Sequence, residues 1–267
     1  PRSLALTIFG DLDLSIIDRL PPGRTPIKTR VVERATRDEV YRWVAERVAG
    51  GEQAYVVVPA VEAQDELADV RSVVDELQNG PLASARVAGM HGRLRGSTRE
   101  HIMQRFRSGL IDCLVATTVI EVGVDVPNAT VMVVENAERF GLAQLHQLRG
   151  RVGRGEKASA CVLIAEATTD DAERRLAAIA ETTDGFKLAE TDFQIRGFGE
   201  VFGAKQSGLP PFKVADLGRD LDLLQLARRD AAAWIERSPT LSSAEETLVR
   251  SRMMKQVGDA LGLADVG

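Results

Sequence analysis

Residues 112–136 read DCLVATTVIEVGVDVPNATVMVVEN and contain two near-continuous apolar runs of strand length, 112–118 and 130–136, on either side of a turn-forming stretch. Strands that are buried on both faces show this pattern. Four further runs are similar, namely IKTRVVE (27–33), QAYVVVPA (53–60), ARVAGMH (85–91) and ACVLIAE (160–166). Helical patterns lie between the runs. The sequence therefore predicts an α/β fold, with a doubly wound, mostly parallel sheet covered by helices on both faces.

The helical patterns carry start and stop signals. Thr36 is a candidate N-cap for a helix over 36–50, and Glu39 follows three residues later, which is the spacing of a capping box. A helix over 64–80 is expected to end in its Asn-Gly pair, which a proline follows. Residues 168–183 predict a helix whose first turn is acidic, as the helix dipole favours.

After the last apolar run the pattern changes. The stretch DFQIRGFGEVFGAKQSGLPPF (192–212) is rich in glycine and has little periodicity, so irregular structure is expected there. Helical patterns return over 213–238 and 243–262, the second behind Ser242 or Ser243 as a cap. The chain is therefore expected to be an α/β domain with a C-terminal helical appendage.

Charge is unevenly distributed along the chain. A net charge of -5 and a pI near 5.4 argue against a uniformly basic nucleic-acid coat. Between His91 and Arg107, however, five arginines and two histidines stand against one acid, Glu100. This cluster is either a basic patch for a polyanion or a solvated helix face.

The two cysteines, Cys113 and Cys161, lie in apolar runs without CxxC spacing, which predicts buried thiols in a reducing cytosol and no disulfide or metal site. No apolar run approaches the roughly 20 residues of a membrane span. The first residues also lack the order of a signal peptide. We therefore expect a soluble, cytoplasmic protein without membrane contact. The start at Pro1, without Met, suggests a fragment of a longer polypeptide.

Two segments are predicted just past strands, where a doubly wound sheet places its ligands. The first is ATTVIEVGVDVPNA (116–129). Here Thr117 and backbone amides near Gly123 can hold phosphate oxygens, and Asp125 can accept a hydrogen bond from a sugar hydroxyl.

The second segment, HQLRGRVGRG (146–155), holds Arg149, Arg151 and Arg154 among glycines, with Gln147 completing a QxxGRxGR pattern. Guanidinium groups on such a backbone can approach a polyphosphate and neutralise the charge that develops during phosphoryl transfer. A surface turn with salt bridges is the better explanation of a lone RxxR. The order and spacing of the two segments favour phosphate binding here.

These segments resemble motifs V and VI of superfamily 2 helicases and translocases. AYVVVPAVEA (54–63) and GMHGRLRGSTREHIMQRFRSG (89–109) are similar to upstream segments of the second motor domain, so that the resemblance covers residues 1–168. It implies a RecA-like domain that closes with a first motor domain around ATP. It also implies that Arg151 and Arg154 are catalytic. Three further residues are implied at the nucleotide edge of the cleft, namely Gly123, Asp125 and Gln147.

The parts that would hold the nucleotide phosphates are absent from this sequence. It has no GxxxxGK[ST] loop and no DExH-type tetrapeptide. ATP and Mg²⁺ are therefore expected to bind to the full-length enzyme and not to this chain alone. Residues 1–24 resemble the end of a first motor domain and the linker that follows it.

A third segment, DGFKLAETDFQIRGFGEVFGAKQSG (184–208), resembles the translocation motif of RecG helicases and transcription-repair coupling factors, and LPPFKVADLGRDLDLLQLARRDA (209–231) is similar to RecG specifically. In that family the motif is a helical hairpin and loop that couples motor closure to pulling on duplex DNA. Phe198 stands where RecG relatives often have proline, so a less stiff loop is expected. The residues implied in DNA contact or coupling are Arg93 with the arginines up to Arg107, Thr117, Arg174, Arg175, Arg196 and Gln206.

The resemblance implies an ATP-dependent DNA helicase that remodels stalled forks and migrates junctions. The expected partners are branched double-stranded DNA, including Holliday junctions, and a wedge and first motor domain of the same polypeptide. The expected division is 1–24 for the linker, 25–168 for the RecA-like domain and 169–267 for the translocation motif with the last helices. A transcription-repair translocase and a non-catalytic DNA-binding module with a dead motor fold are the two alternatives.

Overall fold

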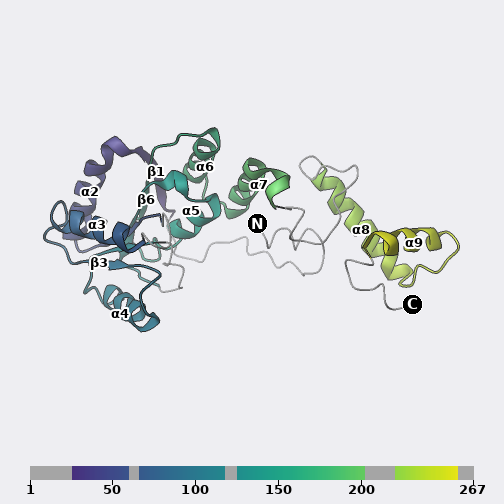
Figure 1. Cartoon of the computed structure of the whole chain (residues 1–267), viewed down its shortest axis with the longest axis horizontal. Helices are drawn as coiled ribbons and strands as arrows, with labels where there is room; N and C mark the ends of the chain where they lie inside the picture. The colour runs from purple at the N-terminus through teal and green to yellow at the C-terminus, as the bar shows by residue number, and fades with distance from the viewer. Residues whose placement is uncertain (1–25, 60–65, 118–124, 202–219, 258–267) are drawn as a thin grey trace. The chain divides into compact units, whose positions relative to one another are not determined.

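The structure, a computed structural model, describes residues 26–59, 66–117, 125–201 and 220–257. Its central element is a six-stranded sheet in the order β1-β6-β5-β2-β4-β3, in which all neighbouring strands are parallel (Figure 1). Each strand falls on one of the predicted apolar runs, which confirms the α/β class. The bounds are β1 Lys28–Glu33, β2 Gln53–Val57, β3 Val87–Met90, β4 Cys113–Ala116, β5 Ala129–Val134 and β6 Ala160–Ala165.

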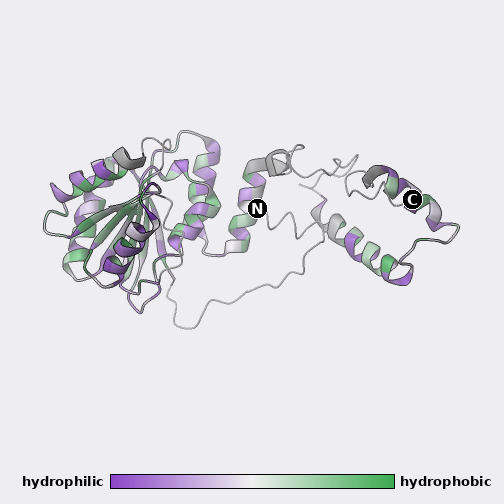
Figure 2. Cartoon of the chain, turned by 60° about the horizontal axis from the view of Figure 1, so that its bottom comes forward, coloured by the Kyte–Doolittle hydropathy of each residue, from purple (hydrophilic) through white to green (hydrophobic). Residues whose placement is uncertain are grey.

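Helices cover both faces of the sheet. Residues of α2 and α3 belong to the apolar cluster on one face, and residues of α4, α5 and α6 belong to the cluster on the other. Figure 2 shows the apolar strands lying between helices that carry hydrophilic residues. The helix bounds are α2 Arg37–Ala49, α3 Glu66–Gln78, α4 Gly96–Arg107, α5 Leu142–Arg149 and α6 Asp170–Glu181.

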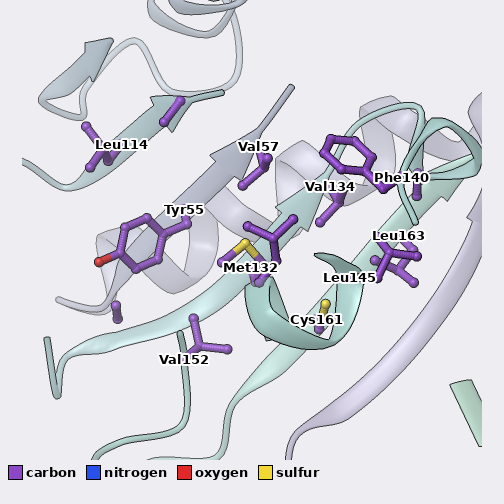
Figure 3. Packing of buried hydrophobic residues seen from close by; sticks show 14 of the residues in the cluster. Tyr55, Val57, Leu114, Met132, Val134, Phe140, Leu145, Val152, Cys161 and Leu163 are labelled. Atoms are coloured by element: carbon purple, nitrogen blue, oxygen red, sulfur yellow. The ribbon is translucent and has the colours of Figure 1, made fainter. Parts of the chain in front are cut away.

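The second strand shows why the apolar runs are continuous. Side chains alternate along β2, so that Tyr55 and Val57 enter one cluster and Val56 enters the other. Figure 3 shows the first cluster, where Tyr55 and Val57 pack near Met132 of β5. Because both faces of the sheet are covered, each residue of β2 is buried and none of its side chains faces solvent.

The predicted capping box at Thr36 is wrong. Thr36 closes a 3-10 turn, η1 (Arg34–Thr36), and its hydroxyl donates to the carbonyl of Glu33 at 2.8 Å. Its side chain makes no cap hydrogen bond to α2. The spacing of a capping box is therefore present without its hydrogen bonds, because the preceding turn leaves Thr36 outside the extended conformation that an N-cap needs.

Two other helices begin where the sequence predicted. The first turn of α6 is acidic, as expected, and the Thr169 side chain in front of it accepts a hydrogen bond from the backbone amide of Ala172 at 3.3 Å. The backbone amide of Glu246 donates to Ser243 Oγ at 3.3 Å, while the amide of Ser243 donates to Glu246 Oε2 at 3.2 Å. This reciprocal pair is a capping box in front of α9 (Glu246–Val257).

The glycine-rich stretch is not irregular where the structure describes it. Helix α7 runs over Gly185–Val201 and includes both glycines of the RGFGE sequence, so the expectation for 192–201 is wrong. Glycine in a helix costs about 1 kcal/mol relative to alanine, but it does not break the helix as proline would. Residues 202–212 lie outside the described ranges. The last two helices are α8 (Leu221–Arg237) and α9, as predicted.

The chain divides into two compact units, and α6 belongs to the unit that holds the sheet, which extends to Asp192. The second unit contains the described residues from Phe193 onward. The boundary that the resemblance placed after residue 168 remains a prediction, and residues 1–24 are not described. Within the described ranges, the chain has no helix with the length and apolar character needed to cross a membrane.

Candidate nucleotide and DNA sites

The segment with the predicted catalytic arginines is a tight turn between α5 and β6. Gly153 has a φ of +74°, and a Cβ at this residue would lie 2.8 Å from Ile27 Cγ1. A Cβ at Gly155 would lie 2.6 Å from the carbonyl oxygen of Pro127. Val152, between the arginines, is fully buried. The glycines thus let the turn press against its neighbours, and Val152 fixes the backbone that carries Arg151 and Arg154.

Asp125 and Arg154, which come from the two different predicted segments, lie together. Arg154 Nε is 3.8 Å from Asp125 Oδ1, and the side chains are 30% and 56% exposed. An exposed ion pair at this distance contributes little, about 0 to 1 kcal/mol. The contact therefore brings the two residues to one place without holding the guanidinium tightly.

Tyr55 of β2 lies close to the same three charged residues, and the sequence reading missed it. Its hydroxyl interacts electrostatically with Arg151, Arg154 and Asp125. Burial raises the pKa of Tyr55 to about 12, although the two arginines act in the opposite direction. The sequence contains little indication of this proximity, because a single tyrosine in an apolar strand is common. Tyr55 is therefore a buried tyrosine within electrostatic range of the arginine turn.

The expectation that both segments follow strand ends is wrong for the arginine segment. Helix α5 leads the chain back from the end of β5, so the arginine turn lies at the edge where β6 begins. Asp125 lies four residues before β5 and belongs to that same edge. Thr117 directly follows β4 and lies at the opposite, carboxyl edge. The structure therefore places Thr117 and the arginine turn at opposite edges of the sheet.

Arg149 does not belong to the arginine site. Its guanidinium is buried and donates to the carbonyl oxygens of Ile179 and Thr182, both at 2.8 Å. Burial lowers the pKa of Arg149. The interpretation of all three arginines as facing a polyphosphate is thus wrong for Arg149, because its side chain turns into the α5–α6 interface.

At the carboxyl edge, His91 and Thr117 follow the neighbouring strands β3 and β4. The amide of Thr117 donates to the carbonyl of Met90 at 3.3 Å, which extends the β3–β4 ladder. His91 Nδ1 and Thr117 Oγ1 are both buried and lack a hydrogen-bond partner among the residues that the structure describes.

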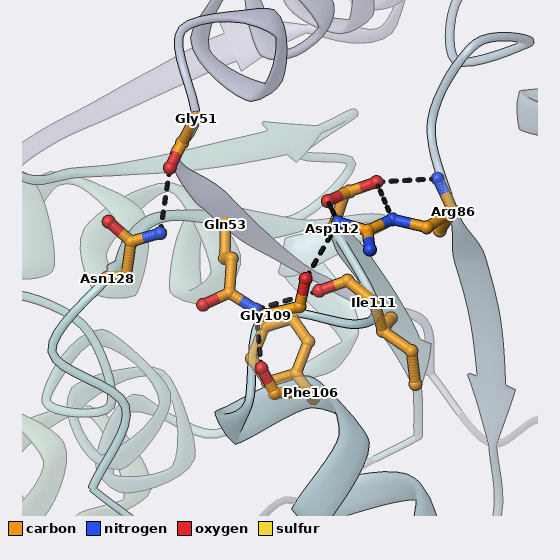
Figure 4. Close-up of polar contacts among 8 residues, drawn as sticks. All are labelled: Gly51, Gln53, Arg86, Phe106, Gly109, Ile111, Asp112 and Asn128. Atoms are coloured by element: carbon orange, nitrogen blue, oxygen red, sulfur yellow. Dashed lines mark hydrogen bonds and ion pairs between the residues drawn. The ribbon is translucent and has the colours of Figure 1, made fainter.

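The basic cluster lies on and before α4, which is firmly attached to the sheet. The Gln53 amide donates to the carbonyls of Phe106 and Ile111, at 2.6 and 2.7 Å, where α4 ends and β4 approaches (Figure 4). Arg86 and Asp112 pair nearby, with Nε donating to Oδ2 at 2.9 Å. The first turn of α4 contains no acid. Four of the five arginines of the cluster are exposed, namely Arg93, Arg95, Arg105 and Arg107. The fifth, Arg99, is partly buried.

The remaining predicted residues are distributed as follows. Gln147 is exposed on α5, one turn before the arginine turn. Arg174 is exposed on α6, whereas Arg175 Nη2 donates to the carbonyl of Glu138 at 3.1 Å. Arg196 lies on α7, although its side chain is not described. Gly123 and Gln206 lie outside the described residues.

A hollow of about 450 Å³ lies at the carboxyl ends of β2 and β5 but contains none of the predicted site residues. Arg37 Nε donates to Glu135 at 2.6 Å, Arg37 also pairs with Glu76, and the Tyr41 hydroxyl donates to Glu135 at 2.6 Å. Burial alone lowers the pKa of Arg37, but the two carboxylates raise it above its ordinary value. The Arg37 guanidinium of this hollow is thus paired with carboxylates on two neighbouring segments.

Comparison with known proteins gives two family matches. Residues 36–156 match the helicase conserved C-terminal domain. Residues 182–260 match the family described as ATP-dependent DNA helicase RecG, domain 3, C-terminal.

Individual relatives agree with these matches. The chain is 47% identical over 246 residues to the ATP-dependent DNA helicase RecG of Synechocystis sp., covering 91% of this chain and 30% of that protein. It is 43% identical over 258 residues to that of Bacillus subtilis, covering 96% and 38%. A solved structure of RecG bound to a three-way DNA junction matches with a TM-score of 0.65 and 47% identity, over 84% of this chain and 29% of that one. The chain thus spans about a third of the length of these relatives.

Proposed function

Because the chain belongs to the RecG family and corresponds to its C-terminal part, we propose that the intact protein is an ATP-dependent DNA helicase that remodels stalled forks and migrates branched DNA. The single observation that carries the proposal is the arginine turn, which presents Arg151 and Arg154 beside Asp125 on a backbone fixed by glycines. This chain has no phosphate loop of its own. The arginines therefore act on a nucleotide that another part of the protein binds.

In this proposal ATP is the substrate, and Arg151 and Arg154 approach its γ-phosphate when the two motor domains close. Negative charge on the phosphoryl oxygens is stabilised by planar guanidinium donors, which lowers the barrier to attack by water. The weak pairing with Asp125 leaves Arg154 able to turn toward the phosphate. From their positions in the motifs, we assign Asp125, Gly123 and Gln147 to the nucleotide edge of the cleft. Mg²⁺, when bound by the first motor domain, supplies further neutralisation of the phosphate charge.

We assign DNA contact to the opposite edge of the sheet. We assign Thr117 and the arginines from Arg93 to Arg107 to backbone phosphates, which is supported by the exposure of Arg93, Arg95, Arg105 and Arg107. Contacts to phosphates carry no sequence information, as a motor that moves along any duplex requires. The RecG relative of known structure is bound to a three-way junction, which supports branched DNA as the partner.

We assign coupling of ATP hydrolysis to movement on DNA to Arg196 and Gln206. Arg174 and Arg175 on the preceding helix belong to the same assignment. Arg175 already holds α6 to the carbonyl of Glu138, which supports a role in positioning that helix, whereas the exposed Arg174 is suited to DNA phosphate. A transcription-repair translocase is not favoured, because residues 182–260 match the RecG family itself.

The proposal is tested with the intact protein and a three-way DNA junction. We expect ATP hydrolysis to be stimulated by the junction and the junction to be unwound only when ATP is hydrolysed. A linear duplex of equal length is the matched control and should not be unwound. Tight junction binding without any ATP hydrolysis would instead support the dead-motor alternative and refute the proposed activity.

A further inference from the structure

Tyr55 brings a polar atom into one of the two apolar clusters. It is the third residue of β2 and is 1% exposed. Its ring packs against Phe106, with the ring centroids 4.8 Å apart. Figure 3 shows the hydroxyl group directed away from Met132, one of the apolar residues of the cluster. Because a buried tyrosine hydroxyl usually has a polar partner, the role of this atom depends on the polar groups near it.

Both charged segments of the candidate nucleotide site are anchored in the same apolar cluster as Tyr55. Val152 directly follows Arg151 in the turn and is fully buried in this cluster. Val126 directly follows Asp125 and is 1% exposed in the same cluster. The charged side chains therefore begin on backbone at the margin of the cluster that contains the phenol. In agreement, the Tyr55 hydroxyl interacts electrostatically with both arginines of the turn and with Asp125.

A neutral hydroxyl can orient a guanidinium group without cancelling its charge. The phenol oxygen can accept a hydrogen bond from a guanidinium N–H. Burial raises the pKa of Tyr55 to about 12, so the phenol stays neutral near pH 7. A buried carboxylate at this position would instead form an ion pair and remove the positive charge that stabilises phosphoryl oxygens. The carboxylate that is present, Asp125, is 56% exposed and pairs with Arg154 only at 3.8 Å.

We infer that Tyr55 is a positioning residue for ATP hydrolysis, whose hydroxyl orients the guanidinium groups of Arg151 and Arg154 for the γ-phosphate. This inference rests on the proposed function. Val152 and the glycines already fix the backbone of the turn, so the direction of the two long side chains is what remains to be restricted. Restricting them before the nucleotide arrives lowers the entropy cost of reaching the transition state. Tyr55 acts through the arginines and does not touch the nucleotide.

The test uses the full-length protein with Tyr55→Phe, which removes one oxygen atom and keeps the ring. The matched control is Tyr41→Phe, because Tyr41 is 2% exposed and its hydroxyl donates to Glu135 at 2.6 Å, but it belongs to the other apolar cluster. Melting temperature, KM for ATP and junction-stimulated kcat are measured for each variant. We expect Tyr55→Phe to lower kcat about tenfold, as for one lost hydrogen bond to a charged group, and to keep KM within about twofold. The control should lose at least as much melting temperature and keep kcat within about twofold.

Single-turnover hydrolysis then shows whether Tyr55 acts through the arginines. Tyr55→Phe is combined with Arg151→Ala and, separately, with Arg154→Ala, and its effect should become smaller in at least one of these backgrounds. A loss that persists in full in both backgrounds overturns the inference, as does an unchanged kcat in folded Tyr55→Phe. Unfolding by Tyr55→Phe also overturns it, because the hydroxyl is then structural. Absence of junction-stimulated hydrolysis in the unaltered protein is a different failure, that of the proposed function.

Discussion

Replacing Arg154 by alanine in the intact enzyme separates a catalytic role from a structural one. The Arg154 guanidinium forms a long ion pair with Asp125, with Nε 3.8 Å from Oδ1, in which the side chains are 30% and 56% exposed. Loss of such a pair costs about 1 kcal/mol or less. For a domain of this size that corresponds to a fall in melting temperature of about 2 to 4 °C.

The expected effect on catalysis is much larger. An arginine that stabilises the transition state for phosphoryl transfer contributes about 10³-fold or more to kcat, which corresponds to about 4 kcal/mol. Binding of ATP in the ground state should change much less, because the developing charge is absent there. Arg154→Lys should restore little of the rate, since an ammonium lacks the planar donor pair of guanidinium.

The assay combines melting temperature, ATP affinity and single-turnover hydrolysis on the same preparation. Arg47→Ala is the matched control, because it removes an ion pair to Glu52 at 2.7 Å and a hydrogen bond to the carbonyl of Ala158. It should cost at least as much stability and leave hydrolysis by the folded protein nearly unchanged. Unchanged hydrolysis in folded Arg154→Ala would refute the assignment and leave Arg151 as the candidate.

Four further outcomes are expected. The 267-residue chain alone should not hydrolyse ATP with or without DNA, because it has no phosphate loop, and turnover that persists after removal of contaminating ATPases would contradict this. Gln206→Ala or Arg196→Ala in the intact enzyme should keep much of the ATP hydrolysis while impairing junction unwinding; an equal loss of both counts against coupling. Cys113 and Cys161 should resist a thiol reagent in the folded protein, because burial raises the pKa of each to about 12, and fast labelling without unfolding would disprove it. Hydrogen bonds, the largest contribution coming from Trp234 of α8, lower the pKa of Glu246 from 4.5 to about 2. The ionised Glu246 therefore stabilises the fold above pH 4.5, and this stabilisation is lost as the pH falls toward 2. Glu246→Gln should flatten this pH dependence of the melting temperature, measured by circular dichroism.

The sequence by itself determined the α/β class, because the hydrophobic pattern of each strand is a local property. A strand covered on both faces needs apolar side chains at consecutive positions, and all six runs became strands. The acidic first turn of the helix that begins after Thr169 was predicted for the same reason, since it depends on neighbouring residues alone. Local spacing was insufficient at Thr36, because a 3-10 turn precedes its helix.

The resemblance assigned Asp125 and Arg154 to one nucleotide site, which stays a prediction, and the structure places the two side chains 3.8 Å apart. Motif spacing did not predict at which edge of the sheet the arginine turn lies, since this position depends on α5 returning the chain to the start of β6. Tyr55 joins the arginines from a strand about a hundred residues earlier in the chain, and no short-range pattern contains that proximity.

Arg149 shows the same limit most clearly. In the sequence it is equivalent to Arg151 and Arg154, an arginine next to glycine. In the structure its donors reach carbonyls 30 and 33 residues away, at the end of α6. The direction of a side chain on the last turn of a helix depends on what packs against that turn, and only the tertiary structure brings α6 there.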